Sequence, residues 1–252
     1  MYPTLFRIGT FEITSFGVMV AIGALVGIWL FGRELARSGL PEDAANAAVA
    51  GVLGGLLGAK LLWTAEHLGE APALSLLLSR GGMSWFGGLV GGVVAGLIVM
   101  RRQRLPIVRT LAAATPALAV GHAIGRIGCF LVGDDYGRPS DLPWAVAFPQ
   151  GLPPTTDRVH PTQLYEMAAL FVLAAVLIAW RRRGVRDGVV LGRYLLIAGA
   201  IRFAIEFVRV NVRVLGPFTV AHLIAAGLMI VGLVVMVRSR EAHGATNARR
   251  LA

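Results

Sequence analysis

Two pairs of ionisable residues stand inside long apolar stretches, where charged side chains are costly. His122 and Arg126 are four residues apart, and so are Arg202 and Glu206. In a helix, residues four apart share one face, so the members of each pair lie close together. A guanidinium suits a phosphate because its planar fork donates to two oxygens at once. The two arginines therefore predict a site for a phosphate-bearing headgroup, although Arg202 and Glu206 could also simply neutralise each other.

Further residues could move protons or orient a ligand. His160 stands just before the start of a later apolar stretch, with Tyr165 and Glu166 close by. It could orient a headgroup or transfer protons, or it could be a helix-start residue at an interface with a tyrosine anchor. His222 is interpreted as a packing or hydrogen-bonding residue. We find no metal-ligand spacing, Gly-rich nucleotide loop or serine nucleophile elbow in the sequence, so no metal or nucleotide mechanism is expected.

The elements that must position these residues are apolar stretches of about twenty residues. Hydrophobic residues make up 56% of the 252 residues and charged residues 15%, and the mean hydropathy is +0.70. A run of about 20 apolar residues matches the bilayer core, and its backbone must be helical to satisfy its own hydrogen bonds. The predicted fold is an all-α, polytopic membrane protein of about seven transmembrane helices. The expected spans are Ser15–Leu35, Ala45–Leu62, Ser84–Met100, Thr110–Leu131, Gln163–Trp180, Val189–Val208 and Phe218–Val237.

The remaining segments complete the predicted organisation. Residues 1–240 are expected to form a single transmembrane helical domain, followed by a polar tail at residues 241–252. Residues 133–161 form the longest non-helical stretch and are predicted to be an outer loop, and a loop of this length is usually functional or disordered. Ala71–Ser79 is too short to span and is interpreted as an interfacial or re-entrant helix. Gly54 and Gly58, four residues apart, form a small-residue face that lets helix backbones approach closely.

The arginines set the expected orientation. The net charge is +10, but its distribution indicates a membrane protein rather than a nucleic-acid partner. Fourteen arginines follow the first, third, fifth and seventh spans, against six on the opposite side. The positive-inside rule therefore places the N-terminus outside and the C-terminus in the cytoplasm. The first residues lack a basic region and a cleavage site, so the first helix is expected to be a retained anchor.

Four segments carry a resemblance to a known family. Gly125–Arg138, GRIGCFLVGDDYGR, resembles the signature of prolipoprotein diacylglyceryl transferases, and His160–Glu166, HPTQLYE, follows it at a suitable distance. Met83–Leu89, MSWFGGL, is similar to the start of the family's Gly-Gly-Leu helix. Gly199–Glu206, GAIRFAIE, is similar to its late arginine-containing helix. The family's seven helices and orientation agree with the topology above.

The resemblance implies an enzyme of the bacterial inner (cytoplasmic) membrane that performs the first step of lipoprotein maturation. Such an enzyme moves diacylglyceryl from phosphatidylglycerol to the lipobox cysteine thiol of a preprolipoprotein, and glycerol phosphate leaves. It implies no cofactor. Arg126 and Arg202 match the family's two important arginines and would hold the phosphate. The other residues implied for the phosphatidylglycerol site are Gly125, Gly128, Gly133, Gly137, Glu166 and Glu206.

Several positions depart from the family pattern. Phe86 replaces the usual histidine before Gly-Gly-Leu, Cys129 replaces an asparagine, and Asp134 replaces a glutamate. The chain therefore resembles a divergent member in which another residue must accept the thiol proton. Our hypothesis is that His122, His160 or Asp134 supplies this base.

Two alternative functions follow from the same departures. The chain could be a related transferase that keeps the lipid donor and uses a different acceptor. It could also be a non-catalytic phospholipid-binding membrane protein, which would bind phosphatidylglycerol without turnover.

Overall fold

The fold is built from long apolar helices. The computed structural model describes residues 2–9, 11–79 and 82–251, and within them six helices are long and apolar enough to cross a membrane. This confirms a helical, multi-pass membrane protein. The six are α1 (Ser15–Arg37), α2 (Asn46–Glu66, preceded by the 3-10 turn Glu42–Ala45), α5 (Ile107–Val132), α6 (Thr162–Arg182), α7 (Asp187–Glu206) and α8 (Val220–Leu251).

The remaining predicted span is also a helix. It is α4 (Trp85–Arg102), which has 18 residues and ends in two arginines. The segment judged too short to span contains α3 (Ala73–Leu78), a helix of 6 residues. Most of the expected helix boundaries are therefore correct to within a few residues, because the length of each apolar run defines its helix. The end of the last span is wrong, since it was expected at Val237 and α8 continues to Leu251, into the segment expected to be a polar tail.

Contacts divide the chain into two compact units, Ile28–Thr110 and Met1–Gly27 with Leu111–Ala252. The prediction of a single domain over residues 1–240 stays a prediction. In the first unit, α2 packs on α4 through glycines. A Cβ added to Gly58 would lie 2.9 Å from the Cα of Gly91, and one added to Gly54 would lie 2.8 Å from the Gly91 carbonyl oxygen. The small-residue face predicted at Gly54 and Gly58 is confirmed.

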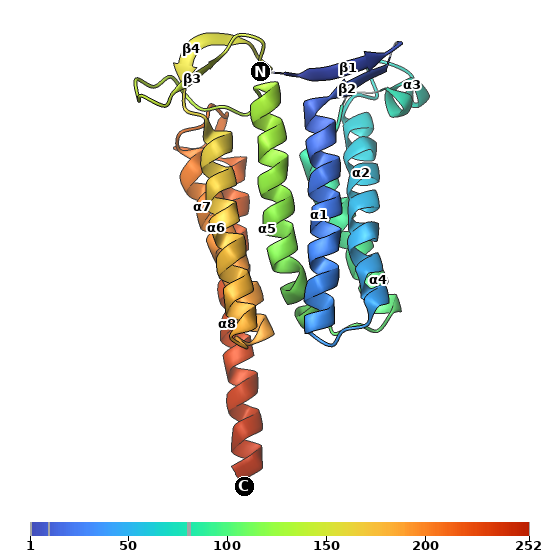
Figure 1. Cartoon of the computed structure of the whole chain (residues 1–252), viewed down its shortest axis with the longest axis vertical. Coiled ribbons are helices and arrows are strands. Elements are labelled where there is room, and N and C mark those ends of the chain that lie inside the picture. Colours follow the sequence, from blue (N-terminus) through green and yellow to red (C-terminus); the bar gives the residue numbers. More distant parts are fainter. Residues whose placement is uncertain (1, 10, 80–81, 252) are drawn as a thin grey trace. The chain divides into compact units, whose positions relative to one another are not determined.

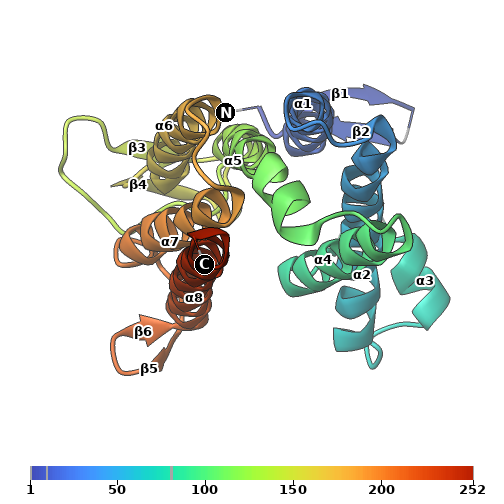
Figure 2. The same cartoon turned by 90° about the horizontal axis from the view of Figure 1, so that it is seen from below.

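In the second unit, α6, α7 and α8 lie side by side (Figures 1 and 2). Gly199 lets α7 approach α8, since a Cβ there would lie 2.9 Å from the Ala225 carbonyl oxygen. Apolar side chains of α5, α6 and α7 fill the core of this unit. Its buried members are Ala119, Ala123, Leu170, Leu173, Ala174, Leu177 and Val190.

The described residues of the second unit include three antiparallel hairpins at helix ends. β1 (Thr4–Ile8) and β2 (Phe11–Thr14) precede α1, β3 (Val146–Phe148) and β4 (Thr155–Val159) connect α5 to α6, and β5 (Arg213–Leu215) and β6 (Phe218–Thr219) connect α7 to α8. The β3–β4 hairpin belongs to the predicted outer loop at residues 133–161, which is non-helical as expected. It lies over the start of α6 (Figure 1).

Backbone hydrogen bonds fasten both ends of this loop. The Gly137 amide donates to the His160 carbonyl (2.9 Å), and the His160 amide donates to the Arg138 carbonyl (3.1 Å). The Arg138 amide donates in turn to the Val208 carbonyl, just beyond α7 (2.9 Å). The loop is thereby held against the ends of α6 and α7, where the ionisable residues gather.

Candidate active site

The first half of the candidate site is a carboxylate shared between α5 and α6. Arg126 Nε lies 2.8 Å from Glu166 Oε2, and both side chains are largely buried, at 11% and 2% exposed. Glu166 reaches α5 because it stands on the second turn of α6, on the buried side of that helix. His122, one turn before Arg126, places Nε2 3.5 Å from Glu166 Oε1. The predicted shared face of His122 and Arg126 is confirmed, and one carboxylate serves both.

The second half lies on α7 and the turn that follows it. Arg202 Nη1 lies 2.8 Å from Glu206 Oε2, which confirms the pairing suggested by their spacing. The other Glu206 oxygen accepts hydrogen bonds from Asn211 Nδ2 (2.6 Å) and Thr219 Oγ1 (2.7 Å). Arg209 Nε is 3.6 Å from Glu206 Oε2, so this buried carboxylate has four neighbours.

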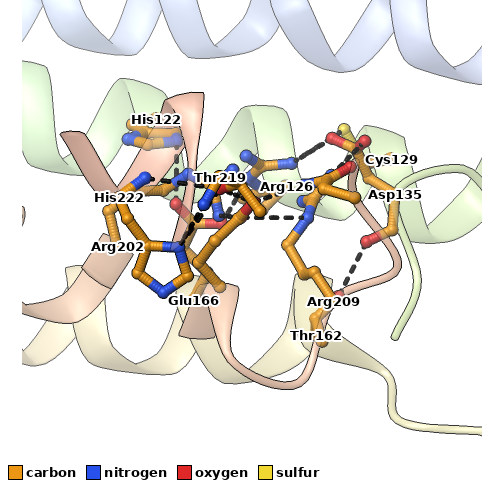
Figure 3. Close-up of polar contacts among 12 residues, drawn as sticks. His122, Arg126, Cys129, Asp135, Thr162, Glu166, Arg202, Arg209, Thr219 and His222 are labelled. Atoms are coloured by element: carbon orange, nitrogen blue, oxygen red, sulfur yellow. Dashed lines mark hydrogen bonds and ion pairs between the residues drawn. The ribbon is translucent and has the colours of Figure 1, made fainter. Parts of the chain in front are cut away.

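Asp135 joins the two halves. Its carboxylate pairs with Arg126 Nη1 (2.8 Å) and also with Arg209 (Figure 3). The backbone of Asp135 is left-handed, with φ 61°, and Thr162 Oγ1 donates to its carbonyl (2.7 Å). Burial opposes ionisation of Asp135, but the charges of Arg209 and Arg126 outweigh burial and lower its pKa to about 2. Asp135 is therefore ionised and bridges two arginines.

Glu206 is not the only acid that pairs with the intramembrane arginines, since Glu166 and Asp135 both pair with Arg126. A buried guanidinium needs a partner to offset its desolvation. The side chain of Arg202 is 24% exposed, against 11% for Arg126. Arg202 is thus the more accessible of the two for an anionic ligand.

Asp134 and Cys129 lie beside Arg126. Arg126 Nη1 is 3.7 Å from the sulfur of buried Cys129, and Gln163 Nε2 donates to the Asp134 carbonyl (2.5 Å). Burial, reinforced by the charge of Asp135, raises the pKa of the Asp134 carboxyl. The side chains of Cys129, Asp134 and Asp135 offer ligand atoms within 4.8 Å of one another. Because Asp135 is engaged by two arginines, the electrostatics disfavour a cation there.

His160 belongs to a different group of side chains. Its Nδ1 lies 3.3 Å from the Tyr165 hydroxyl, which also accepts a hydrogen bond from Trp144 Nε1 at 2.7 Å. The structure therefore places His160 beside Tyr165, at the end of the loop formed by residues 133–161. Of the three proposed bases, His122 is the one whose described contact is to a carboxylate partner of Arg126.

The four signature glycines have different surroundings. Gly133 has φ 75° and follows the end of α5, a conformation that glycine adopts without strain. A Cβ on Gly128 would lie 3.0 Å from Met19 Cβ, and one on Gly137 would lie 2.8 Å from His160 Cβ. A Cβ on Gly125 would meet nothing within 4 Å. Gly125 therefore borders open space next to Arg126, whereas Gly128 and Gly137 serve close packing.

Sequence reasoning missed three members of the cluster, namely Asp135, Asn211 and Thr219. Asp135 is part of the signature segment, but its bridging role depends on a left-handed turn that no periodic pattern reveals. Asn211 lies between α7 and β5, and Thr219 is the last residue of β6, so spacing rules for helices do not apply to them. His222 was expected to form hydrogen bonds, and it does so with Thr219.

An apolar groove of about 400 Å³ lies between α6 and α7. Two of its lining residues are close in sequence to the charged cluster, since Ala169 is three residues after Glu166 and Ile201 precedes Arg202. All the lining side chains are aliphatic. They are Ala168, Ala169, Val172, Leu173, Val176, Ile197 and Ile201.

Comparison with known proteins identifies the family. A family model described as prolipoprotein diacylglyceryl transferase matches residues 3–238. The chain belongs to this family. Among its relatives, the phosphatidylglycerol–prolipoprotein diacylglyceryl transferase of Clostridium tetani is 32% identical over 83% of this chain and 86% of the relative. The enzymes of the same name from Geobacter sulfurreducens and Bordetella bronchiseptica are 34% and 36% identical, over 93% and 90% of this chain and 94% and 87% of the relatives. The residues matched by the family model therefore include all three arginines of the site, Arg126, Arg202 and Arg209.

Proposed function

We propose that this membrane enzyme transfers the diacylglyceryl group of phosphatidylglycerol to a cysteine thiol of prolipoproteins, the first step of bacterial lipoprotein maturation. The family match over nearly the whole chain supports this type of reaction. The cluster of arginines at one end of α5 and α7 supports a phosphate-bearing donor, because guanidinium groups bind phosphate oxygens in pairs.

The reaction forms one bond and breaks another. The thiol sulfur attacks the glyceryl carbon that carries the phosphate, so a C–S bond forms while the C–O bond to phosphate breaks. The bonding electrons remain on the phosphate oxygen, and glycerol phosphate leaves. Arg202, the more accessible guanidinium, holds this phosphate and stabilises its growing charge. Arg126 is the second hydrogen-bond donor to the phosphate.

We assign to His122 the role of the general base that accepts the thiol proton. Its Nε2 lies 3.5 Å from Glu166 Oε1, so the carboxylate can stabilise the imidazolium that forms when the ring accepts the proton. The side chain of His122 is 47% exposed, which leaves it accessible to an incoming thiol. His160 and Asp134 are the other candidates, and Asp134 has a raised pKa that suits a base.

The groove between α6 and α7 suits an acyl chain of the donor. It is lined by aliphatic side chains, and two of the lining residues, Ala169 and Ile201, are close in sequence to Glu166 and Arg202. A diacyl phospholipid has this same arrangement, with an anionic head next to apolar chains. We therefore place one acyl chain along Ala169, Val172 and Val176.

We further propose seven crossings in the bacterial inner membrane, with α4 as the third, an external N-terminus and a cytoplasmic C-terminus. The arginine distribution supports this orientation. The acceptor would then be the lipobox cysteine of a preprolipoprotein that reaches the site from the outer side, near residues 133–161.

The decisive experiment measures transfer of labelled diacylglyceryl from phosphatidylglycerol to a lipobox peptide by the purified protein. We expect transfer by the wild type, and its loss with Arg202→Ala, with Arg126→Ala and with a Cys→Ser peptide. Phosphatidylglycerol binding without transfer to any thiol peptide would instead indicate a non-catalytic lipid-binding protein. Transfer to other thiol acceptors alone would indicate a related transferase with a different acceptor.

The base assignment has its own test in the same assay. General-base catalysis contributes about 100- to 10,000-fold, so His122→Ala should lower the rate by at least about 100-fold. His160→Ala and Asp134→Asn should cost far less. Full activity in all three variants would refute every base that we consider.

A further inference from the structure

His222 lies at the start of α8 in an aromatic enclosure. Its side chain is among the most buried in the described residues, at 1% exposed. The rings of Phe203, Phe207 and Phe218 surround it, with centroids at 4.7, 4.6 and 5.4 Å. A buried imidazole among apolar rings is costly unless its polar atoms are used. Of its two ring nitrogens, Nδ1 has hydrogen-bond contacts and Nε2 is buried without a partner among the described residues, so the contacts of Nδ1 indicate why a histidine stands here.

The imidazole acts as a hydrogen-bond acceptor for Thr219. The Thr219 amide donates to His222 Nδ1 at 3.1 Å, so Nδ1 serves as the acceptor nitrogen of the ring. The His222 amide donates back to Thr219 Oγ1 at 3.4 Å. This reciprocal pair resembles a capping box at the beginning of a helix and fixes the Thr219 backbone and hydroxyl together.

Thr219 passes this constraint to a carboxylate of the site. Its hydroxyl donates to Glu206 Oε1 at 2.7 Å, and Asn211 donates to the same oxygen at 2.6 Å. Oε1 is therefore occupied, which directs Oε2 toward Arg202 Nη1 at 2.8 Å. Figure 3 shows the contacts running from His222 through Thr219 toward the arginines.

We propose that His222 is a positioning residue for Arg202. It holds Thr219, Thr219 orients Glu206, and Glu206 sets the guanidinium of Arg202 at the donor phosphate. The inference rests on the proposed function, because it assumes that Arg202 acts on the leaving phosphate. His222 itself touches neither substrate, since its ring is enclosed by phenylalanines and bonded to Thr219.

The chain offers substitutions that separate packing from hydrogen bonding. His222→Phe keeps an aromatic ring in the enclosure and loses the acceptor for the Thr219 amide. His222→Gln loses the ring and supplies a carbonyl oxygen as acceptor. Thr219→Val loses the donor to Glu206, whereas Thr219→Ser keeps it. His67→Phe is a matched control, because His67 stacks on Trp63 in the other compact unit.

The experiment measures kcat and KM for phosphatidylglycerol with the purified full-length variants. His222→Phe and Thr219→Val should lower kcat by about tenfold with KM changed by less than about threefold, because Arg202 acts mainly on charge that develops in the transition state. His222→Gln and Thr219→Ser should retain most of the wild-type kcat, and His67→Phe should match wild type. In a Glu206→Gln background, His222→Phe should cause little further loss.

Three results would overturn the inference. Wild-type kcat in both His222→Phe and Thr219→Val would show that the contacts do not position Arg202. Equal losses in His222→Phe and His222→Gln, with Thr219→Val and Thr219→Ser also equal, would indicate packing alone. If His222→Phe does not fold, the two Thr219 variants decide. An inactive wild type would refute the proposed function and, with it, this inference.

Discussion

Asp135 is the residue that makes one cluster out of two. Arg126 and Arg209 belong to different parts of the second unit, and the Asp135 carboxylate contacts both. Its carbonyl also accepts a hydrogen bond from Thr162 at the start of α6. Loss of this carboxylate would leave two positive side chains close together without the shared anion.

The pKa of Asp135 gives a prediction for acid stability. Its value of about 2 in the folded protein lies below its ordinary value of 3.8, so its ion pairs stabilise the fold fully above about pH 4. That contribution is lost as the pH falls through about 2. We expect Asp135→Asn to unfold at a lower temperature than wild type at pH 6 and pH 4.5, and the gap to narrow towards pH 2.

Thermal unfolding in detergent across this pH range measures the gap. Asp141→Asn is a suitable control, since Asp141 is an exposed residue of the outer loop. A gap that closes between pH 6 and pH 4.5 would contradict the lowered pKa.

At the scale of single residues, part of the candidate site was predictable from the sequence. The pairs His122–Arg126 and Arg202–Glu206 follow from helical spacing, and the structure confirms that each pair shares a face. The cross-helix partners are different, because the contact of Glu166 with Arg126 depends on how α6 packs on α5. The contact of Asp135 with Arg209 depends further on a single left-handed residue. Neither contact can be predicted from the periodic spacing of residues within one helix.

At the scale of elements, glycines determine how closely α2 and α4 pack. A Cβ on Gly58 would lie 2.9 Å from the Cα of Gly91, a distance that backbone atoms cannot accept without moving. Overpacking of this kind costs about 1–3 kcal/mol. Gly58→Ala should therefore lower the thermal unfolding midpoint by several degrees.

Gly32→Ala is the matched control for this prediction. Gly32 is also within a helix, and a Cβ there would meet nothing within 4 Å. It should leave stability unchanged or raise it slightly, since alanine favours a helix over glycine. Equal effects of the two substitutions would show that the close approach of α2 and α4 does not limit stability.

The groove between α6 and α7 gives a second prediction at the scale of elements, which concerns the acyl-chain length of the lipid donor. Ala169 lines it three residues after Glu166, so a phenylalanine there would fill space that we assign to an acyl chain. Ala169→Phe should reduce transfer from long-chain phosphatidylglycerol several-fold more than transfer from a short-chain form. The measurement is the ratio of kcat/KM for the two donors.

Leu118→Phe is a suitable control, because Leu118 is an exposed residue of α5 outside the groove. If Ala169→Phe leaves the ratio of kcat/KM for the two donors unchanged, the acyl chain does not bind in this groove.

Most helix boundaries were predictable to within a few residues, because a bilayer sets the length of an apolar run. The end of α8 was not, since this helix continues beyond its apolar run to Leu251. Val189–Val208 was expected and α7 spans Asp187–Glu206. The three hairpins were not foreseen. β3 has three residues and β6 has two, and strands this short carry no readable alternation of polar and apolar side chains.

At the scale of the whole molecule, orientation is the property that the arginine distribution predicts. Alkaline phosphatase fused after Glu70 should be active, because that turn is predicted to lie outside. Fusions after Arg104 and after Ala252 should be inactive, because both positions are predicted to be cytoplasmic. Green fluorescent protein fused at the same three positions should give the opposite pattern and serves as the control. Activity of the phosphatase fused after Arg104 would show that α4 does not cross.

The fastening of the outer loop has a consequence for the exchange of backbone hydrogens. The amides of Gly137 and Arg138 are bound to the carbonyls of His160 and Val208, beside the ends of α6 and α7, and the His160 amide is bound to the Arg138 carbonyl. Each of these amides exchanges with solvent only when its bond opens. These amides should exchange slowly and together, although they lie in a loop. A peptide acceptor that enters near residues 133–161, as proposed, would therefore meet a backbone that is already ordered at Gly137, Arg138 and His160.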